Sequence, residues 1–376
     1  MKIAHVCPFY EPAICGVKQV VKELAKRQAI QGHDVHVFTS DWDKEKRIAK
    51  KNEIIDGVKV HRCHHYFKIA NFVSFFPSAF NKLIKGRFDI VHSHVFGHPH
   101  FVLSALAAKL SGARHIHTTH CPWSNAYRSA IGNLGLAVSY NIFSRIASTI
   151  TDKIIAITPW EHGFIERYGG RKKKIIDLPN GVASEFFSKI KNNDFRRKHG
   201  IKGKMVLFFG RLNITKGPDK FVDIAKKILK ERKDIDFVIV GPDEGMFNIV
   251  KKKIGNEKRI HLLGAIRDRK EVIKMYQSAD VYVLPSYREG LPLTLFEAMA
   301  SGLPIVASPV NGIPYEMKEP ENGFLVKYGN INDFAKKIVE LLDNKKLKEK
   351  ISKNNIKKAE NYRWDSITEK VLQLYK

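Results

Sequence analysis

Short apolar segments alternate along this chain with longer segments in which apolar residues recur every three or four positions. That alternation predicts β-strands that are each followed by an amphipathic helix, the pattern of a doubly wound α/β protein with parallel sheets. Strands of a first series are expected at 2–7, 35–39, 58–63, 90–94, 114–119 and 153–158. Strands of a second series are expected at 205–209, 236–240, 260–263, 281–284 and 304–307.

Two series of strands in 376 residues indicate two domains, because a chain of this length exceeds one ordinary core. The pattern pauses near Pro179 and resumes after a polar stretch that ends near Lys204. We therefore place a first domain at 1–178 and a second domain at 179–359. Ligands of such sheets bind at the carboxyl ends of the strands, so we expect a ligand cleft between the two domains.

The composition indicates a globular protein of the cytoplasm. Hydrophobic residues make up 44% of the chain and charged residues 27%. No apolar run is long enough to predict a membrane-spanning helix, and the first residues lack the apolar core of a signal peptide. The four cysteines form no Cys-x-x-Cys pair, so we expect free thiols in a reducing compartment.

The net charge of +27, from 65 Lys+Arg and 38 Asp+Glu, favours anionic partners. Phosphorylated ligands, an anionic membrane and nucleic acid all fit that description. The cations are spread over several helices instead of forming one tail, so we interpret most of them as a solvated surface. A nucleic acid partner is not expected.

The segment 289–297 carries the most informative chemistry of the chain. Glu289 precedes Gly290 and Pro292 in a loop after an apolar strand, and Glu297 lies about one turn into the helix that follows. The free N–H groups in the first turn of that helix attract anions such as phosphate. Two carboxylates around a phosphate site suit a ligand with a central phosphate and hydroxyl groups at both ends, which describes a nucleotide-sugar.

Arg211 and Lys216 follow the first strand of the second series, in a loop at a carboxyl end of the predicted sheet. Two cations there can neutralise the negative charge that builds up on a leaving diphosphate. In a lysine-rich chain they can also be ordinary surface cations. Their place in the same domain as the segment 289–297 favours the functional interpretation.

In the first domain, Gly16 lies between the first strand and its helix, where glycine permits close approach of a phosphate or a sugar, although it can equally be a simple turn glycine. Histidines gather at two strands and the loops after them: His92, His94, His98, His100, His115, His117 and His120. No carboxylate or cysteine completes a recognisable ligand spacing, so a metal site is not expected. His120, just past a strand end, is the best placed of them to contact a substrate.

The segment 66–80 is rich in aromatic residues, and Lys82, Lys85 and Arg87 follow it. Packing of these residues on the first sheet explains this composition most simply. The alternative is an apolar flank with basic edges that contacts a lipid acceptor or an anionic membrane. In that case the protein is expected to be peripheral at the inner face of the cell membrane.

Together these residues resemble the retaining glycosyltransferases of GT-B fold that carry the Glu-x7-Glu motif, a family 4-like group also described as glycosyl transferases group 1. The similarity covers nearly the whole chain. Its motifs lie at Gly16, 32–35, 89–94, 179–182, 210–211, 216–217, 279–280, 285–286, 289–300, 302–304, 322–323 and Trp364. The chain departs from many relatives at Cys15-Gly16, where they have two glycines.

The resemblance implies two Rossmann-like domains that face a central cleft, with the C-terminal segment 360–376 crossing back to the N-terminal domain. It implies a hexosyltransferase whose second domain binds a nucleotide-diphospho-sugar as co-substrate. Its first domain would hold the acceptor, which can be a glycan, a lipid-linked sugar or a small molecule.

For single residues, the resemblance implies that Arg211 and Lys216 bind the diphosphate, Glu297 the ribose and Glu289 the transferred sugar. Amides near Leu293 and Thr294 would hold phosphate, Ile266 would lie beside the base, and His120 and Gly16 would face the sugar. No metal or other cofactor is expected, because protein cations and a helix N-terminus can carry the leaving-group charge. The string Asp-x-Asp, a metal-nucleotide motif in a different glycosyltransferase fold, occurs at 41–43 and 234–236, and we interpret both as chance matches.

Two other functions stay open at this point. A sugar-nucleotide 2-epimerase shares the fold and binds a nucleotide-sugar, but it fits the spacing of the two glutamates less well. A basic nucleic-acid-binding protein would explain the charge, but it would not need a pocket for phosphate and hydroxyl groups.

Overall fold

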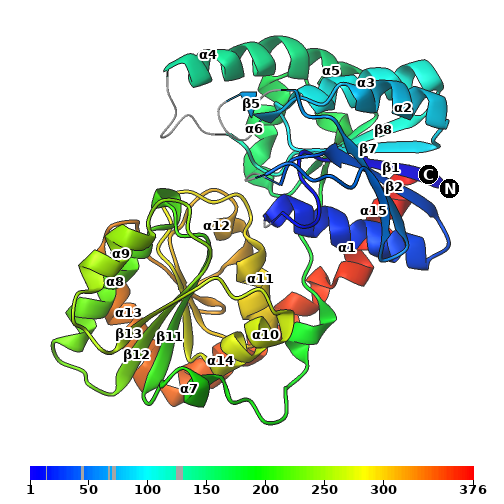
Figure 1. The fold of residues 1–376 in the computed structure, drawn as a ribbon. Helices are drawn as coiled ribbons and strands as arrows, with labels where there is room; N and C mark the ends of the chain where they lie inside the picture. Colours follow the sequence, from blue (N-terminus) through cyan, green and yellow to red (C-terminus); the bar gives the residue numbers. More distant parts are fainter. Residues whose placement is uncertain (14, 44–45, 67, 70–72, 124–129) are drawn as a thin grey trace. The chain divides into compact units, whose positions relative to one another are not determined.

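The structure is a computed structural model that describes residues 1–13, 15–43, 46–66, 68–69, 73–123 and 130–376 (Figure 1). The chain forms two compact units. The first comprises Met1–Asn180 together with Trp364–Lys376, and the second comprises Gly181–Arg363. The boundaries expected from the sequence were 178/179 and 359/360. Each unit is an α/β unit with its own sheet.

The first unit contains a sheet of eight strands in the order β10-β9-β8-β7-β1-β2-β4-β3. Its strands are β1 (Lys2–Val6), β2 (Asp34–Ser40), β3 (Asn52–Ile55), β4 (Val58–Cys63), β7 (Ile90–His94), β8 (Arg114–Thr118), β9 (Lys153–Ala156) and β10 (Ile175–Asp177). Neighbours are parallel except β3, which runs antiparallel to β4. The six predicted strands are confirmed. Both edge strands, β3 and β10, escaped prediction because they are short and partly exposed, which leaves little apolar pattern.

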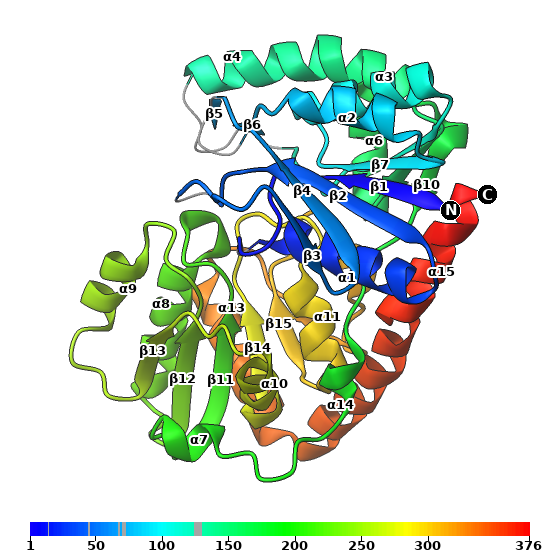
Figure 2. The same cartoon turned by 45° about the vertical axis from the view of Figure 1, so that its right-hand side comes forward.

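Helices cover both faces of this sheet (Figures 1 and 2). On one face lie α2 (Ser78–Gly86) and α3 (Pro99–Ser111), and on the other lie α1 (Gly16–Ile30) and α15 (Trp364–Tyr375), which pack on each other. An ion pair of 2.6 Å between Arg27 Nε and Asp365 Oδ1 joins α1 to α15. The C-terminal helix therefore belongs to the first unit, as the resemblance implied.

The rest of the first unit is mainly helical. A helical stretch runs through α4 (Ala130–Val138), the π-helical η1 (Ser139–Ser144) and α5 (Arg145–Ile150). It is followed after β9 by the 3-10 turn η2 (Pro159–Glu161), α6 (His162–Arg167) and the turn η3 (Lys172–Lys174). A separate pair of two-residue strands, β5 (Lys68–Ile69) and β6 (Val73–Ser74), lies before α2.

The second unit contains a parallel sheet of six strands in the order β13-β12-β11-β14-β15-β16. Its strands are β11 (Lys204–Phe209), β12 (Ile235–Val240), β13 (Ile260–Gly264), β14 (Val281–Leu284), β15 (Ile305–Ala307) and β16 (Gly323–Leu325). Its helices are α7 (Phe195–Lys198), α8 (Pro218–Leu229), α9 (Phe247–Ile254), α10 (Arg269–Ser278), α11 (Leu293–Ala300), α12 (Ile313–Glu316), α13 (Ile331–Asp343) and α14 (Lys345–Ala359). The five predicted strands of this series are confirmed.

Both faces of the second sheet are covered, which explains why its strands are continuous apolar runs instead of alternating ones. Consecutive residues of β11 show the two faces. Phe208 packs on Phe221 of α8, with ring centroids 5.7 Å apart, and Phe209 packs on Tyr276 of α10 at 5.6 Å. Since every strand is parallel, the loops that leave the strands at their carboxyl ends all lie along one edge of the sheet.

None of the described helices is both long enough and apolar enough to cross a bilayer.

Candidate functional site

Two loops at the carboxyl edge of the second sheet are held against each other by their backbones. The loop after β14 donates two hydrogen bonds to the carbonyl of Thr215, from the N–H groups of Tyr287 at 2.9 Å and Arg288 at 3.2 Å. Gly217 has φ +67°, and a Cβ atom there would lie 2.1 Å from the carbonyl oxygen of Pro285. Only glycine allows this approach, so the loops 210–217 and 285–290 pack closely together and form one corner of the sheet edge.

Lys216 and Glu289, both predicted site residues, form a salt bridge at this corner. The pair is largely shielded from water, since the side chains are 15% and 2% exposed. The other carboxylate oxygen of Glu289 accepts a hydrogen bond of 2.7 Å from the Ser286 hydroxyl. Burial lowers the pKa of Lys216, the nearby charge of Arg211 lowers it further, and Glu289 opposes the shift. The carboxylate of Glu289 therefore stabilises the charged ammonium group of Lys216 at a place that little water reaches.

Arg211, on the same loop, lies nearer the surface. Its guanidinium donates a hydrogen bond of 2.6 Å to Glu244, and the amide of Asn213 donates to the same oxygen at 3.0 Å. Glu244 follows β12 and was not predicted as a site residue. Its position just after a strand end could have indicated it. Asn213 also accepts from the backbone N–H of Lys216 and so shapes the turn that presents this lysine.

Helix α11 begins at the same corner. Pro292 precedes Leu293 and Thr294, and no side chain caps the first turn of the helix. Glu297, one turn further on, accepts a hydrogen bond of 3.0 Å from the Tyr276 hydroxyl of α10. Burial raises the pKa of Tyr276 well above its ordinary value, and the neighbouring charge of Glu297 adds to that shift, so the tyrosine stays a donor. The half-exposed Glu297 is therefore held at a fixed place beside free amides.

Ile266 lies in the loop between β13 and α10, at the same edge of the sheet and partly exposed. The structure thus gathers most of the predicted residues of the second domain around one corner. Lys216 and Glu289 are in contact, and Leu293, Thr294 and Glu297 follow on α11. Arg211 lies on the loop of Lys216, and Ile266 lies on the loop after β13, two strands away at the same edge of the sheet.

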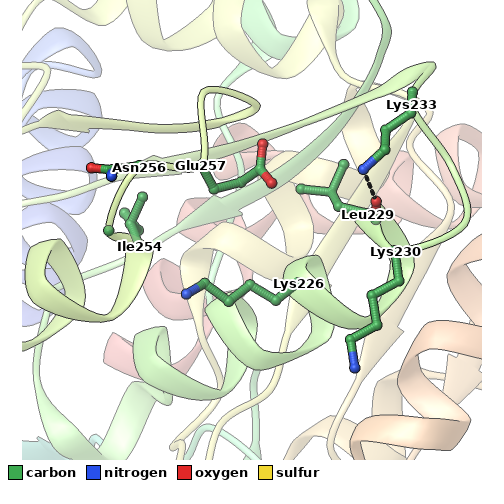
Figure 3. A pocket seen from close by; sticks show the side chains of 8 residues that line it. Lys226, Leu229, Lys230, Lys233, Ile254, Asn256 and Glu257 are labelled. Carbon is green, nitrogen blue, oxygen red and sulfur yellow. Dashed lines mark hydrogen bonds between the residues drawn. The ribbon is translucent and has the colours of Figure 1, made fainter.

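A hollow of about 410 Å³ lies elsewhere on the second unit (Figure 3). It is lined by the C-terminal ends of α8 and α9, with Lys226, Lys230, Lys233 and Glu257 among its residues. These residues lie just before β12 and β13, at the amino ends of the strands. None of the predicted site residues lines this hollow.

In the first unit, Gly16 is the first residue of α1, and the Sγ atom of Cys15 accepts from the N–H of Lys18 as a weak cap. Apart from its chain neighbours and its own helix, none of the described residues has an atom within 4 Å of a Cβ atom built at position 16, and φ there is not positive. The fold of the unit itself therefore does not require glycine at position 16.

His120 follows β8 and is held from two sides. Both His120 and Cys121 have positive φ, at 57° and 56°, which is uncommon for residues with side chains. The carboxylate of Glu161, which is fully buried, fixes the backbone there by accepting from the Cys121 N–H at 2.7 Å and the Thr119 hydroxyl at 2.7 Å. On the other side, the Nε2 atom of His120 lies 3.1 Å from Nδ1 of His94.

Glu161 was missed by the sequence analysis. It also accepts from the Trp123 indole at 2.9 Å and the Ile157 N–H at 2.8 Å, which makes four donors in all. Burial raises its pKa to about 7, and the four donors limit that rise. A lone glutamate after Thr-Pro-Trp carries no pattern that distinguishes it from a surface residue.

The histidine cluster is a buried hydrogen-bond network. His5, His92 and His94 lie close enough that their nitrogens fall within 4.8 Å of one another. Each of those nitrogens already has a protein partner: His5 bonds to Gln28 and His94, His92 to Tyr375 and Thr118, and His94 to His5 and His120. These rings therefore belong to one hydrogen-bond network within the first unit.

Both Asp-x-Asp strings have other partners. Asp234 and Asp236 lie at the start of β12, away from the carboxyl edge, where Asp234 pairs with Arg232 and Asp236 accepts from His261 and the Gly203 N–H. Asp41 pairs with Arg47 and accepts from the His65 N–H. Their carboxylates thus stabilise local structure.

The aromatic segment 66–80 divides in the structure. Phe67 and the residues 70–72 lie outside the described part of the chain. Phe76 is 2% exposed and belongs to the core under α2, so at this position the packing interpretation is correct and the membrane interpretation is wrong. Phe75 is half-buried, and only Tyr66 among the described aromatic residues of the segment is well exposed.

We predict that acid destabilises the first unit through its buried histidines. Burial lowers the pKa of His5 and His100 to about 4 and of His115 and His120 to about 3, and it lowers those of His92, His94 and His117 strongly. Below pH 6.5 these histidines bind protons in the unfolded chain but stay neutral in the folded unit. The free energy of unfolding therefore falls as the pH falls below 6.5. Each histidine lowers the free energy of unfolding by about 1.4 kcal/mol per pH unit between its unfolded and its folded pKa.

Glu161, whose folded pKa is raised, contributes with the opposite sign but is one group against seven. All four tryptophans, Trp42, Trp123, Trp160 and Trp364, belong to the first unit, so their fluorescence reports its melting. The melting temperature should be clearly lower at pH 5.5 than at pH 7.5. An unchanged transition would contradict the prediction.

We also predict different stability costs for the two cations of the corner. Lys216→Met leaves the carboxylate of Glu289 buried without its cation, which should lower the free energy of unfolding by roughly 3–5 kcal/mol. Arg211→Met removes an exposed pair and should cost about 1 kcal/mol or less. Urea unfolding followed by circular dichroism measures both. The charge-balanced double variant Lys216→Met/Glu289→Gln should recover part of the loss, and equal costs for the two single variants would show that the pair is not buried as described.

Comparison with known proteins agrees with this geometry. The family described as Glycosyl transferases group 1 matches residues 191–358, and the family described as Glycosyltransferase Family 4 matches residues 14–186. A galactosyltransferase of Escherichia coli, named UDP-Gal:alpha-D-GlcNAc-diphosphoundecaprenol alpha-1,3-galactosyltransferase, is 32% identical over 281 residues, which are 72% of this chain and 70% of that protein. An uncharacterized glycosyltransferase of Methanocaldococcus jannaschii is 28% identical over 100% of this chain and 98% of its own.

Solved structures show the same fold. The Anabaena protein HepE in complex with UDP has a TM-score of 0.79 at 18% identity, with 100% of this chain and 99% of that chain covered. Taken with the two mainly parallel sheets, each with helices on both faces, these similarities show that the chain belongs to the family 4-like glycosyltransferases of GT-B fold and is a glycosyltransferase.

Proposed function

We propose that this enzyme transfers a hexose from a nucleotide-diphospho-sugar to an acceptor hydroxyl group with retention of the anomeric configuration. The observation that carries the proposal is the corner of the second unit, where the shielded Lys216–Glu289 pair lies beside the uncapped first turn of α11. Similar proteins support the donor class, since the E. coli relative is named for UDP-Gal as its donor and the Anabaena structures hold UDP and UDP-glucose.

The corner offers a separate group for each part of such a donor. The amides of Leu293 and Thr294 and the cations Lys216 and Arg211 suit the diphosphate. Glu297, which Tyr276 holds in place, suits the ribose diol, and the partly exposed Ile266 suits a face of the base. Glu289 then faces the hexose while it keeps the Lys216 ammonium charged.

The transfer balances without another reactant. The acceptor oxygen forms a bond to the anomeric carbon, the bond from that carbon to the phosphate oxygen breaks, and the acceptor proton passes to the departing diphosphate on the same face. Lys216 and Arg211 stabilise the charge that develops on the diphosphate. Protein cations thus do what a divalent ion does elsewhere, and the carboxylates of Asp234 and Asp236 already serve other partners at the opposite edge of the sheet. We therefore infer that the reaction is independent of metal.

In the first unit, we assign Gly16 and His120 to the transferred sugar and the acceptor. Gly16 is the first residue of α1, where the lack of a side chain permits close approach of a ligand to the backbone. His120 is held by Glu161 through its neighbouring backbone and by His94 through its ring, as a positioned ligand contact requires.

A screen of UDP-, GDP- and ADP-hexoses in the presence of EDTA tests this function. We predict slow donor hydrolysis for at least one donor, and the first sugar detected by NMR, before mutarotation, should have the anomeric configuration of the donor. Arg211→Met, which should fold normally, should lower turnover on the order of a hundredfold. An inverted product, an absolute need for Mg²⁺ or Mn²⁺, or release of the 2-epimer would each overturn part of the proposal.

For the acceptor we propose a glycan or a lipid-linked sugar, and for the lipid-linked case an anionic membrane surface. The supporting surface is the stripe Leu134, Val138, Ile142 and Ile146, whose members are spaced by four along α4, η1 and α5 and are between 41% and 68% exposed. Phe143 beside it is 48% exposed. An exposed apolar stripe on one helical face suits the headgroup region of a bilayer.

Cations flank one end of this stripe. Arg145 donates to the carbonyl of Arg167, and the ammonium group of Lys174 donates to the carbonyl of Thr149, so the turn 171–174, Arg-Lys-Lys-Lys, lies beside the end of α5. A cationic edge next to apolar side chains complements an anionic bilayer. This surface replaces the segment 66–80, whose Phe76 is core.

Co-sedimentation with vesicles measures the membrane contact. We predict binding to phosphatidylglycerol vesicles that weakens with salt and is lost in Ile142→Ser/Ile146→Ser. The matched control Ile249→Ser/Ile356→Ser removes two exposed isoleucines of the second unit and should bind as the wild type does. If the wild type ignores anionic vesicles at low salt, the membrane contact is wrong and the transferase assignment stands.

A further inference from the structure

His120 is the outer end of a chain of hydrogen-bonded imidazoles that runs into the first unit. Its Nε2 atom lies 3.1 Å from Nδ1 of His94, and Nε2 of His94 lies 3.0 Å from Nδ1 of His5. Nε2 of His5 lies 2.7 Å from the side-chain oxygen of Gln28 on α1. His5 and His94 come from β1 and β7, and both are fully buried together with Gln28. These hydrogen-bonded side chains thus link His120 to the buried amide of Gln28 on α1.

Gln28 determines which nitrogen donates and which accepts in each of these imidazole hydrogen bonds. Its oxygen can only accept, so Nε2 of His5 carries a proton and donates to it. The contact of 2.7 Å is shorter than the two contacts between imidazole nitrogens, as expected for an N–H group that donates to oxygen. The amide nitrogen of Gln28 donates to the Tyr375 hydroxyl at 3.3 Å, and this hydroxyl donates to Nδ1 of His92 at 2.7 Å. Helix α15 therefore orients the amide of Gln28.

Each ring passes the direction to the next, because a neutral imidazole has one donor nitrogen and one acceptor nitrogen. Burial lowers the pKa of all three histidines, so none of them carries the second proton near neutral pH. With Nε2 of His5 protonated, its Nδ1 accepts from Nε2 of His94. In turn, Nδ1 of His94 accepts from Nε2 of His120. Among the described residues, no group bonds to the remaining nitrogen, Nδ1 of His120.

We propose that Gln28, His5 and His94 are positioning residues that hold His120 in the Nε2–H tautomer, so that its Nδ1 lone pair accepts a hydrogen bond from a hydroxyl group of the bound sugar. The identity of the ligand rests on the proposed function. The tautomer does not, since it follows from the network alone.

The network also explains why the first unit uses a Gln and three His where apolar residues would pack more simply. An isolated imidazole at a site mouth interconverts between two tautomers, and only one of them can accept through Nδ1. Three linked rings must change together, and the change would leave the Gln28 oxygen facing a nitrogen lone pair. The buried amide thus fixes the hydrogen-bonding role of a ring three side chains away.

The direct test is ¹⁵N NMR of the protein with labelled histidine, with the His120 signals assigned through a His120→Asn variant. The expected wild-type pattern is a protonated Nε2 and an unprotonated Nδ1 at His120. Protonated Nδ1 would overturn the proposal. Since the wild type alone decides this point, the proposal stays testable even if variants of the network fail to fold.

A variant and a matched control test the role of Gln28. Gln28→Met removes the acceptor for His5 and should shift His120 to a mixture of tautomers. Gln19→Met makes the same change at a partly exposed position of the same helix and should leave the His120 signals unchanged. An unchanged His120 tautomer in folded Gln28→Met would refute the positioning role.

Ligand binding supplies the second measurement. In Gln28→Met the affinity for a nucleotide-sugar should fall about threefold to tenfold, as for one lost hydrogen bond, while the affinity for the nucleoside diphosphate, which has no hexose, should not change. Equal loss for both ligands would overturn the sugar contact. If neither ligand binds the wild type, the proposed function fails, and the NMR result still decides the tautomer.

Discussion

The buried ion pair of Lys216 and Glu289 is the interaction on which the candidate site of the second unit depends. It joins two loops that leave different strands, β11 and β14, and the backbone bonds to Thr215 hold the same loops together. A lysine this well shielded stays charged because a carboxylate lies against it, and the carboxylate is tolerated because Lys216 and Ser286 satisfy its two oxygens. An anionic ligand that reaches this corner meets a preformed cation and does not have to order one.

The first unit stabilises its buried polar side chains in a different way. Burial lowers the pKa values of His5, His92, His94, His100, His115, His117 and His120, so these imidazoles remain neutral. Neutral rings can be both donors and acceptors, so they build a directional network that charged groups could not build. The charged pair of one unit suits phosphate, and the neutral network of the other suits hydroxyl groups. A nucleotide-sugar and its acceptor carry both kinds of group.

The supporting residues of each unit belong to other elements than the residues that they position. Tyr276 on α10 fixes Glu297 on α11, Glu161 fixes the backbone beside His120, and Tyr375 on α15 orients Gln28 on α1. These contacts explain why the C-terminal helix is integrated into the first unit and is not a detached tail. The Tyr375 hydroxyl group of this helix is part of the same hydrogen-bond network as His120.

The sequence by itself determined the two α/β units, eleven of their strands, and the loops that carry the candidate residues, because apolar periodicity and strand-end positions are local properties. It also indicated His120, Glu289 and Lys216, since their positions follow from strand ends. Only the tertiary structure decided that Lys216 and Glu289 are in contact, that Glu161 holds the His120 backbone, and that Phe76 is core while the stripe from Leu134 to Ile146 is exposed. Burial and pairing depend on which distant segment covers a residue, and a local pattern of apolar positions contains no information about that segment.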